Sequence, residues 1–145
     1  MPLQKSCGSY SAPVGDGNDC SVRALSIAAN IPYSACSALF AKHGRTPGRR
    51  TPHHVTRGVY RELGIPAPMY YTARPTVAQF IRENPKGRFI LTRSGHAFSL
   101  VDSVIHDWAD GTGPRSRILF AARVPDTGIT RAVPFTPSTT HTKGL

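Results

Sequence analysis

Long hydrophobic runs are missing from this sequence, and apolar residues make up only 39% of its 145 positions. A helix that crosses a membrane needs about 20 consecutive, mainly apolar residues, so we expect no membrane partner. The residues after Met1 lack the basic and then apolar pattern of a secretory signal. We therefore expect a soluble protein inside the cell that makes it. Its length allows one hydrophobic core and is too small for two.

Cysteine pairs are also missing. The three cysteines, Cys7, Cys20 and Cys36, are odd in number and form no Cys-x-x-Cys motif, which argues against a disulfide framework. No set of His and Cys residues has the spacing of zinc ligands, and the neighbours His53 and His54 point in different directions on a predicted helix. We therefore expect neither a metal nor a cofactor. Cys36 lies inside an Ala/Leu/Phe-rich helix, where a buried, inert thiol is expected.

Acidic residues are scarce. Asp and Glu total 8 against 18 Lys and Arg, which gives a net charge of +10. A basic surface attracts nucleic acid or acidic proteins. No aromatic-rich strand motif or helix-turn-helix pattern accompanies the charge, so we expect only non-specific contact with nucleic acid. The base composition of the gene is a second explanation, because the chain has 14 Arg and only 4 Lys.

What the sequence does contain is a helical first half and a strand-forming second half. Apolar spacing and turn residues predict helices and strands over the following residues: helices 20–30, 33–42, 51–64 and 76–84, and strands 69–71, 88–93, 96–101, 104–108 and 118–124. Helices followed by an antiparallel sheet indicate the α+β class. We expect the domain to span residues 18–124, after a Gly/Ser-containing extended arm (1–17) and before a Thr/Pro-rich tail (125–145).

Cys20 has the surroundings of a reactive thiol. It follows Gly17-Asn18-Asp19 and begins the first apolar-periodic segment, so it stands at the start of the first predicted helix. There the positive end of the helix dipole and unpaired backbone N–H groups lower the pKa of a thiol and favour the thiolate. Asn18 and Asp19 have a simpler alternative role, as capping residues of this helix.

His96 begins a predicted strand whose partner strand carries an acid. A two-residue turn at 102–103 places Phe98 opposite Asp107, on the face that His96 shares. Asp107 then lies diagonal to His96, about 7–8 Å away between backbones and within side-chain reach. An acid in that place orients the imidazole of a thiolate–imidazolium pair. Asp102 is the rival acid, but it lies further along the strand, and turn aspartates commonly bond to the local backbone.

Three runs of the chain carry a family resemblance. Small papain-like proteins of tailed bacteriophages resemble it in Gly-Asn-Asp-Cys-Ser-Val-Arg-Ala-Leu-Ser-Ile-Ala (17–28), Gly-Arg-Phe-Ile-Leu-Thr-Arg-Ser-Gly-His-Ala-Phe-Ser-Leu-Val-Asp (87–102) and Val-Ile-His-Asp (104–107). These runs are also similar to the bacteriocin-processing peptidases, which have Asp-Cys at a helix start and His at a strand start. The resemblance covers roughly residues 16–124. It implies a papain-like fold with Cys20, His96 and Asp107 as a catalytic triad.

Two functions of different classes fit these features. The first is a thiol hydrolase that cleaves a peptide or isopeptide bond of a protein or peptide substrate in the host cytoplasm. Cys20 attacks the carbonyl, His96 exchanges the proton, Asp107 orients His96, and the Cys20 N–H with Asn18 forms an oxyanion hole. The same triad also serves acyl transfer, so a transamidase or N-acyltransferase stays open.

The second function is a bacteriophage virion component of the head, neck or tail that keeps the fold without the activity. The papain-type glutamine, about six residues before the nucleophile, is replaced by Val14, and Ser-Val follows Cys20 in place of the usual Gly. Terminal arms that reach other virion subunits, and a basic surface near packaged DNA, suit such a protein.

Overall fold

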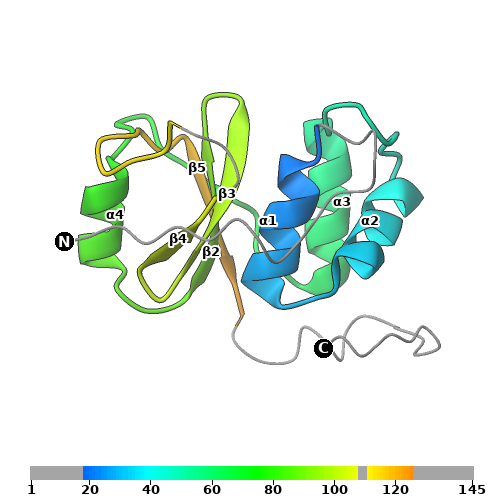
Figure 1. The fold of residues 1–145 in the computed structure, drawn as a ribbon, viewed down its shortest axis with the longest axis horizontal. Coiled ribbons are helices and arrows are strands. Elements are labelled where there is room, and N and C mark those ends of the chain that lie inside the picture. The colour runs from blue at the N-terminus through cyan, green and yellow to red at the C-terminus, as the bar shows by residue number, and fades with distance from the viewer. Residues whose placement is uncertain (1–17, 108–110, 126–145) are drawn as a thin grey trace.

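Three helices come first in the described part of the chain, and four of its five strands come last (Figure 1). The computed structural model describes residues 18–107 and 111–125, so the predicted arm and residues 126–145 of the predicted tail lie outside the described residues. The described helices and strands are α1 (Cys20–Ala29), α2 (Tyr33–Lys42), α3 (His53–Leu63), α4 (Val77–Glu83), β1 (Met69–Tyr70), β2 (Arg88–Arg93), β3 (His96–Val101), β4 (Val104–His106) and β5 (Phe120–Val124). The predicted α+β class is confirmed.

The strands form one antiparallel sheet in the order β1-β5-β2-β3-β4. Helices α1, α2 and α3 lie on one side of it and α4 on the other (Figure 1). The strand residues alternate between the two sides, because side chains in a strand point to opposite faces in turn. Ile90 and Ala122 belong to the core of the three-helix side, and Leu91 and Ala121 belong to the core of the α4 side. The sheet is thus buried on both faces.

Helix α1 lies against the middle of the sheet, where it contacts β2 and β3. Small buried residues, among them Ala24 and Ala28, let its backbone approach the strands. The Ser99 hydroxyl of β3 donates to the Ala24 carbonyl at 2.7 Å. At the other end of α1, the Arg88 guanidinium donates to the Ala28 carbonyl at 3.1 Å, where a cation is favoured by the helix dipole. These contacts fix the helix whose first residue is Cys20.

Several element boundaries differ by one or two residues from the sequence prediction, among them the starts of α3 and β5. Helix α3 begins at His53 after Pro52, whose φ of −65° and ψ of 151° are extended, and the Thr51 side chain provides no cap. Strand β5 begins at Phe120, two residues later than expected. The reason is that Ile118 donates its backbone N–H to the Pro75 carbonyl at 2.8 Å instead of pairing within the sheet. By contrast, the Thr76 side chain caps α4, and its hydroxyl accepts from the Gln79 N–H.

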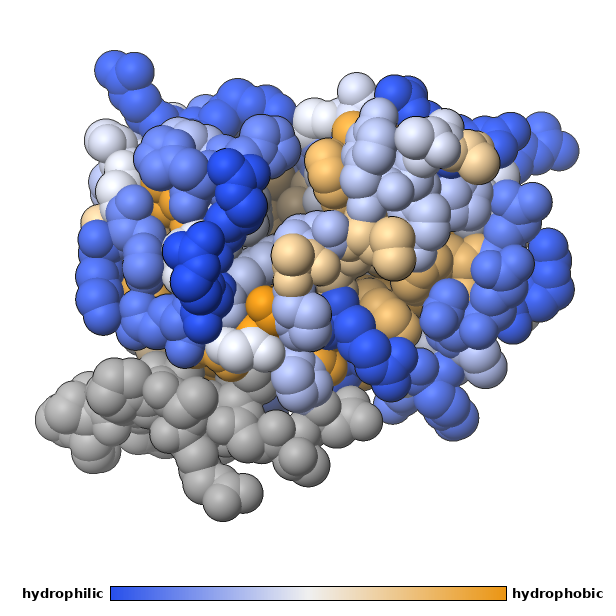
Figure 2. All heavy atoms as spheres, turned by 180° about the vertical axis from the view of Figure 1, so that it is seen from behind, coloured by the Kyte–Doolittle hydropathy of each residue, from blue (hydrophilic) through white to orange (hydrophobic). Residues whose placement is uncertain are grey.

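The surface of the described residues is unevenly polar. Figure 2 shows hydrophilic atoms over the helical half and more apolar atoms across the middle of the face opposite that of Figure 1. Met69 and Tyr70 of β1 are the large hydrophobic residues exposed within the described ranges. In the same ranges, the helices are too short and too polar to span a lipid bilayer.

Candidate active site

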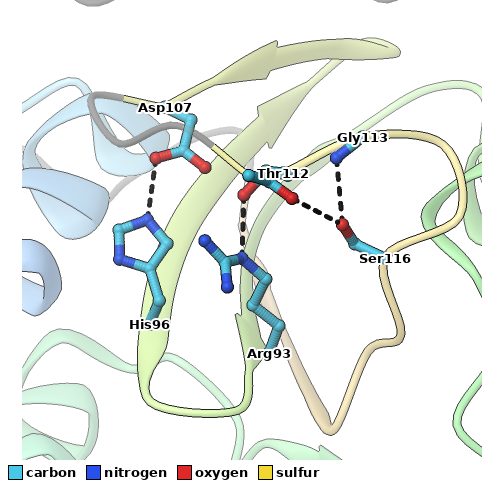
Figure 3. Close-up of polar contacts among 7 residues, drawn as sticks. Arg93, His96, Asp107, Thr112, Gly113 and Ser116 are labelled. Atoms are coloured by element: carbon cyan, nitrogen blue, oxygen red, sulfur yellow. Dashed lines mark hydrogen bonds and ion pairs between the residues drawn. The ribbon is translucent and has the colours of Figure 1, made fainter.

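Three residues that are far apart in the sequence meet at one end of the sheet. Cys20 is the first residue of α1, His96 is the first residue of β3, and Asp107 directly follows β4. The His96 ring hydrogen-bonds the Asp107 carboxylate, with 2.7 Å between Nε2 and Oδ1 (Figure 3). The Cys20 thiol interacts with the same ring, and this interaction lowers the pKa of the thiol and raises that of the imidazole. The predicted cysteine, histidine and acid therefore form one connected chain of polar contacts.

The hairpin has the register that the sequence predicted. Val101 pairs with Val104 and Ser99 with His106, which leaves Asp107 diagonal to His96 across the ladder. Because an ionised carboxylate can only accept a hydrogen bond, the contact with Asp107 places the proton on Nε2 of His96. The second ring nitrogen, Nδ1, is then the one available to Cys20. The contact with Asp107 therefore orients the imidazole so that it can exchange a proton with the Cys20 thiol.

The electrostatics of His96 favour its charged form. Burial alone lowers the pKa of this imidazole, but the hydrogen bond with Asp107 and the contact with Cys20 outweigh it and raise the pKa to about 9. Asp107 itself is fully buried. A buried carboxylate next to an imidazole is a strong local stabiliser of imidazolium, because little water screens the pair.

The electrostatics of Cys20 favour the thiolate. Burial raises the pKa of its thiol, but three neighbours together bring it below its usual value. In order of effect they are the His96 ring, the backbone N–H of Ala97 and the positive charge of Arg50. A thiolate–imidazolium pair is therefore the favoured state between the lowered pKa of Cys20 and the raised pKa of His96.

Asp102, the rival acid, has the local role that the sequence indicated. Its Oδ1 accepts the backbone N–H of Gly87 at 2.9 Å. Its φ of 47° and that of Ser103, 72°, form a two-residue turn with two left-handed residues, the type whose twist matches a hairpin. Asp102 therefore holds the turn at the end of β3 that is remote from His96.

A second polar contact holds the chain just beyond Asp107. Arg93 of β2 pairs with His96 across the ladder, and its Nε donates to the Thr112 hydroxyl at 2.9 Å (Figure 3). Thr112 is buried, and the following turn is closed by the Gly113 N–H, which donates to the Ser116 hydroxyl at 2.9 Å. The sequence did not predict the contact between Arg93 and Thr112, because Thr112 lies in a loop whose residues follow no helix or strand pattern.

Cys20 and His96 face a cleft of about 1120 Å³ between the helical half and the sheet. Its walls include Arg50 before α3, Tyr60 on α3 and Phe120 on β5. The volume is sufficient for several residues of an extended peptide, since ligand pockets are commonly about 300–1,000 Å³.

Asn18, the predicted oxyanion residue, lines this cleft. Its side-chain Nδ2 donates to the Gly48 carbonyl at 2.9 Å, which uses one of the two amide hydrogens. Its backbone carbonyl accepts from the guanidinium of Arg45 at 2.9 Å, and Arg45 is buried. The loop before α3 thus fixes the backbone just before the thiol. The oxyanion role of Asn18 stays a prediction.

Asp19 does not cap α1 with its side chain. Its carboxylate instead accepts from the Arg23 Nε at 3.0 Å and the Tyr33 hydroxyl at 2.8 Å. Asp19 is buried by these contacts, which tie the start of α1 to α2 directly beside Cys20.

Tyr60 is a cleft residue that the sequence analysis did not single out. It is 5% exposed, and its hydroxyl forms no hydrogen bond within the described part of the chain. Burial and then the nearby Cys20 thiolate raise the pKa of this phenol above its usual value. In the sequence, Tyr60 follows the apolar residue Val59 in a predicted helix, and this pattern indicates only a buried aromatic residue of the core.

The other described cysteine and histidines considered in the sequence analysis lie outside the Cys20–His96–Asp107 contacts. Cys36 is fully buried, and burial raises the pKa of its thiol well above the usual value, which agrees with the inert role predicted for it. His53 lines the cleft with its ring 6.0 Å from that of Phe120. Burial and the charge of Arg88 lower the pKa of His106. Residues 18–107 and 111–125 contain no cluster of three or more metal-ligating side chains that could hold an ion.

No family model, curated protein or solved structure gives a significant match to this chain. The functional conclusion therefore depends on the geometry and electrostatics of the site.

Proposed function

We propose that this chain is a papain-like thiol hydrolase that cleaves a peptide or isopeptide bond. The observation that carries the proposal is the His96 ring, which hydrogen-bonds Asp107 and also interacts with the Cys20 thiol at the cleft. A nucleophile, a base in contact with it and a third group that orients the base are the parts that covalent acyl transfer needs. The central helix that begins at the thiol, and the sheet that carries the imidazole, agree with a papain-like arrangement.

The reaction follows from these contacts. The Cys20 thiolate attacks the substrate carbonyl carbon, and a C–S bond forms as the carbonyl electrons move to oxygen. His96, held by Asp107, gives its proton to the leaving amine, and the C–N bond breaks to leave a thioester. Water then attacks the thioester while His96 takes a proton from it, and release of the acid restores the thiolate. An amine in place of water gives acyl transfer by the same steps.

Donors to the developing oxyanion come from the start of α1 and from the cleft wall. The Cys20 backbone N–H is unpaired within the helix because it belongs to the first turn, and Asn18 is adjacent. Tyr60 adds a phenol hydroxyl without a partner among the described residues. We include Tyr60 in the proposal because the papain-type glutamine is absent from the sequence, so that another donor is needed.

A two-part assay tests the proposal. The protein is incubated with p-nitrophenyl acetate and, separately, with a mixed pool of peptides, and both are followed by mass spectrometry. We expect an acetyl group on Cys20, and cleaved peptides that disappear in Cys20→Ser. Absence of both would overturn the hydrolase proposal. Recovery of the protein from purified virions, together with that absence, would favour the virion-component function instead.

A further inference from the structure

The charged side chains of the cleft are mostly positive. Arg23, Arg50 and Arg57 line it, and Asp19 is the only carboxylate among the described lining residues. Asp19 is already paired with Arg23 at 3.0 Å. Arg50 and Arg57 form no ion pair with any residue in the described ranges. Two guanidinium groups thus leave the cleft with an uncompensated positive charge.

Arg50 is held beside the reacting groups. Its Nη2 donates to the carbonyl of Gly95 at 2.9 Å, across the cleft and one residue before His96. Its charge is close enough to favour the Cys20 thiolate. A guanidinium carries five N–H donors in a planar fork, so a single hydrogen bond to Gly95 leaves donors for a carboxylate ligand.

Arg57 lies on the face of α3 that forms one wall of the cleft. His53, Thr56, Arg57 and Tyr60 all line the cleft, and their spacing of three, four and seven positions places them on one helix face. Arg57 is therefore one helical turn from Tyr60, the buried residue of this wall whose pKa the Cys20 thiolate raises.

We propose that the cleft selects peptides with an aspartate or glutamate side chain adjacent to the bond that is cleaved. The inference depends on the proposed hydrolase function, and it adds the class of substrate. Arg50 and Arg57 bind the carboxylate, and they place the neighbouring carbonyl at Cys20. A nucleic acid offers the same negative charge, but it lacks the acyl group on which the thiolate–imidazolium pair acts.

Two alkylating reagents of equal size test this selection. They are N-iodoacetyl-glutamic acid α-amide, which carries a side-chain carboxylate, and N-iodoacetyl-glutamine amide, which is neutral. In both, the Cys20 thiolate attacks the methylene carbon, the C–S bond forms as the C–I bond breaks, and iodide leaves with the bonding electrons. The ratio of the two rate constants, divided by the same ratio for glutathione, reports recognition of the carboxylate. Differences in thiolate fraction between variants cancel in this ratio.

We expect a normalised ratio of about three or more at low ionic strength, the effect of one unit charge roughly 6 Å away in a water-like medium. The ratio should approach one in about 1 M salt, because charges are then screened beyond about 3 Å. Arg50→Gln and Arg57→Gln should each lower it toward one. Arg82→Gln removes the same charge from α4, on the other side of the sheet, and should leave it unchanged.

The outcomes separate this inference from the hydrolase proposal. If neither reagent modifies Cys20 faster than glutathione, the hydrolase proposal fails. If both reagents modify Cys20 rapidly and at the same normalised rate, only the acidic-substrate inference is overturned. An effect of Arg82→Gln as large as that of Arg50→Gln would attribute the preference to the overall charge, and would overturn it too. Protection of Cys20 by an oligonucleotide at lower concentration than by a Glu-rich peptide would assign the cleft to nucleic acid.

Discussion

Removal of the Asp107 carboxylate should lower the pKa of His96 by about two units. The ring has a pKa of about 9, and the contact with Asp107, at 2.7 Å, is the largest of the effects that raise it. For charge centres about 4 Å apart, an effective dielectric constant of about 20 gives roughly 4 kcal/mol, or about three units. Asp107→Asn removes the charge but retains a carbonyl oxygen that accepts a hydrogen bond, so we expect a smaller change that brings the pKa near 7.

The pKa of His96 is measured by NMR titration of its ring nitrogens, in a Cys20→Ser background so that the thiol does not titrate with it. Because Cys20 also raises this pKa, the starting value in that background lies below about 9, and the difference between the two variants is the quantity that tests the contact. Asp102→Asn is the matched control, because its carboxylate bonds the Gly87 N–H at the far end of the hairpin. A change of less than about half a unit in Asp107→Asn, or a larger change in Asp102→Asn, would refute the assigned contact.

The same substitution should have a pH-dependent effect on stability. The pKa of His96, about 9 in the folded protein, lies above its usual value of about 6.5. Protonation of His96 therefore stabilises the fold fully below about pH 6.5, and this stabilisation is lost as the pH rises through about 9. Urea unfolding should accordingly show a larger loss of free energy for Asp107→Asn near pH 6 than near pH 9.5. An equal loss at both values would contradict the charge interaction.

Three further predictions concern the thiols, the helix anchor and the cleft donor. In the native protein, iodoacetamide should modify Cys20 far faster than Cys36, and the two should react alike after unfolding, as peptide mapping would show. Ser99→Ala removes a buried hydrogen bond to the α1 backbone and should lower the free energy of unfolding by about 1–2 kcal/mol, whereas the exposed control Ser34→Ala should change it by less than about 0.5 kcal/mol. Tyr60→Phe should slow ester turnover by about tenfold or more but leave alkylation of Cys20 unchanged, since alkylation develops no oxyanion. An equal loss in both reactions would mean that Tyr60 acts on the thiol or on the fold.

Local patterns in the sequence predicted most of the fold. Apolar spacing predicted the four helices. The predicted end at residue 64 and start at residue 76 have local causes, because Gly64 is left-handed and the Thr76 hydroxyl caps α4. The contact between His96 and Asp107 was also predictable, because a two-residue turn fixes which residues of a hairpin are diagonal neighbours.

The rest of the site depends on contacts between distant segments. Arg45 resembles any surface arginine in the sequence, yet it is buried against the Asn18 carbonyl because the loop before α3 folds over the start of α1. Arg50 meets Gly95 across the cleft, 45 positions along the chain. Tyr60 has the spacing of a core residue, and only the packing of α3 beside Cys20 places it in the cleft. The spacing of apolar residues along a helix or strand does not predict such contacts between distant segments.

The central claim is that His96, oriented by Asp107, makes Cys20 a thiolate at neutral pH. The most direct test is the rate of iodoacetamide modification of Cys20 from about pH 4 to about pH 10, in the wild type and in His96→Ala, with the modified residue mapped by mass spectrometry. The account predicts a wild-type midpoint below the value of about 8.5 for free cysteine, and a midpoint that rises in His96→Ala because the ring contact is lost. A wild-type midpoint at or above about 8.5 that is unchanged in His96→Ala would contradict it.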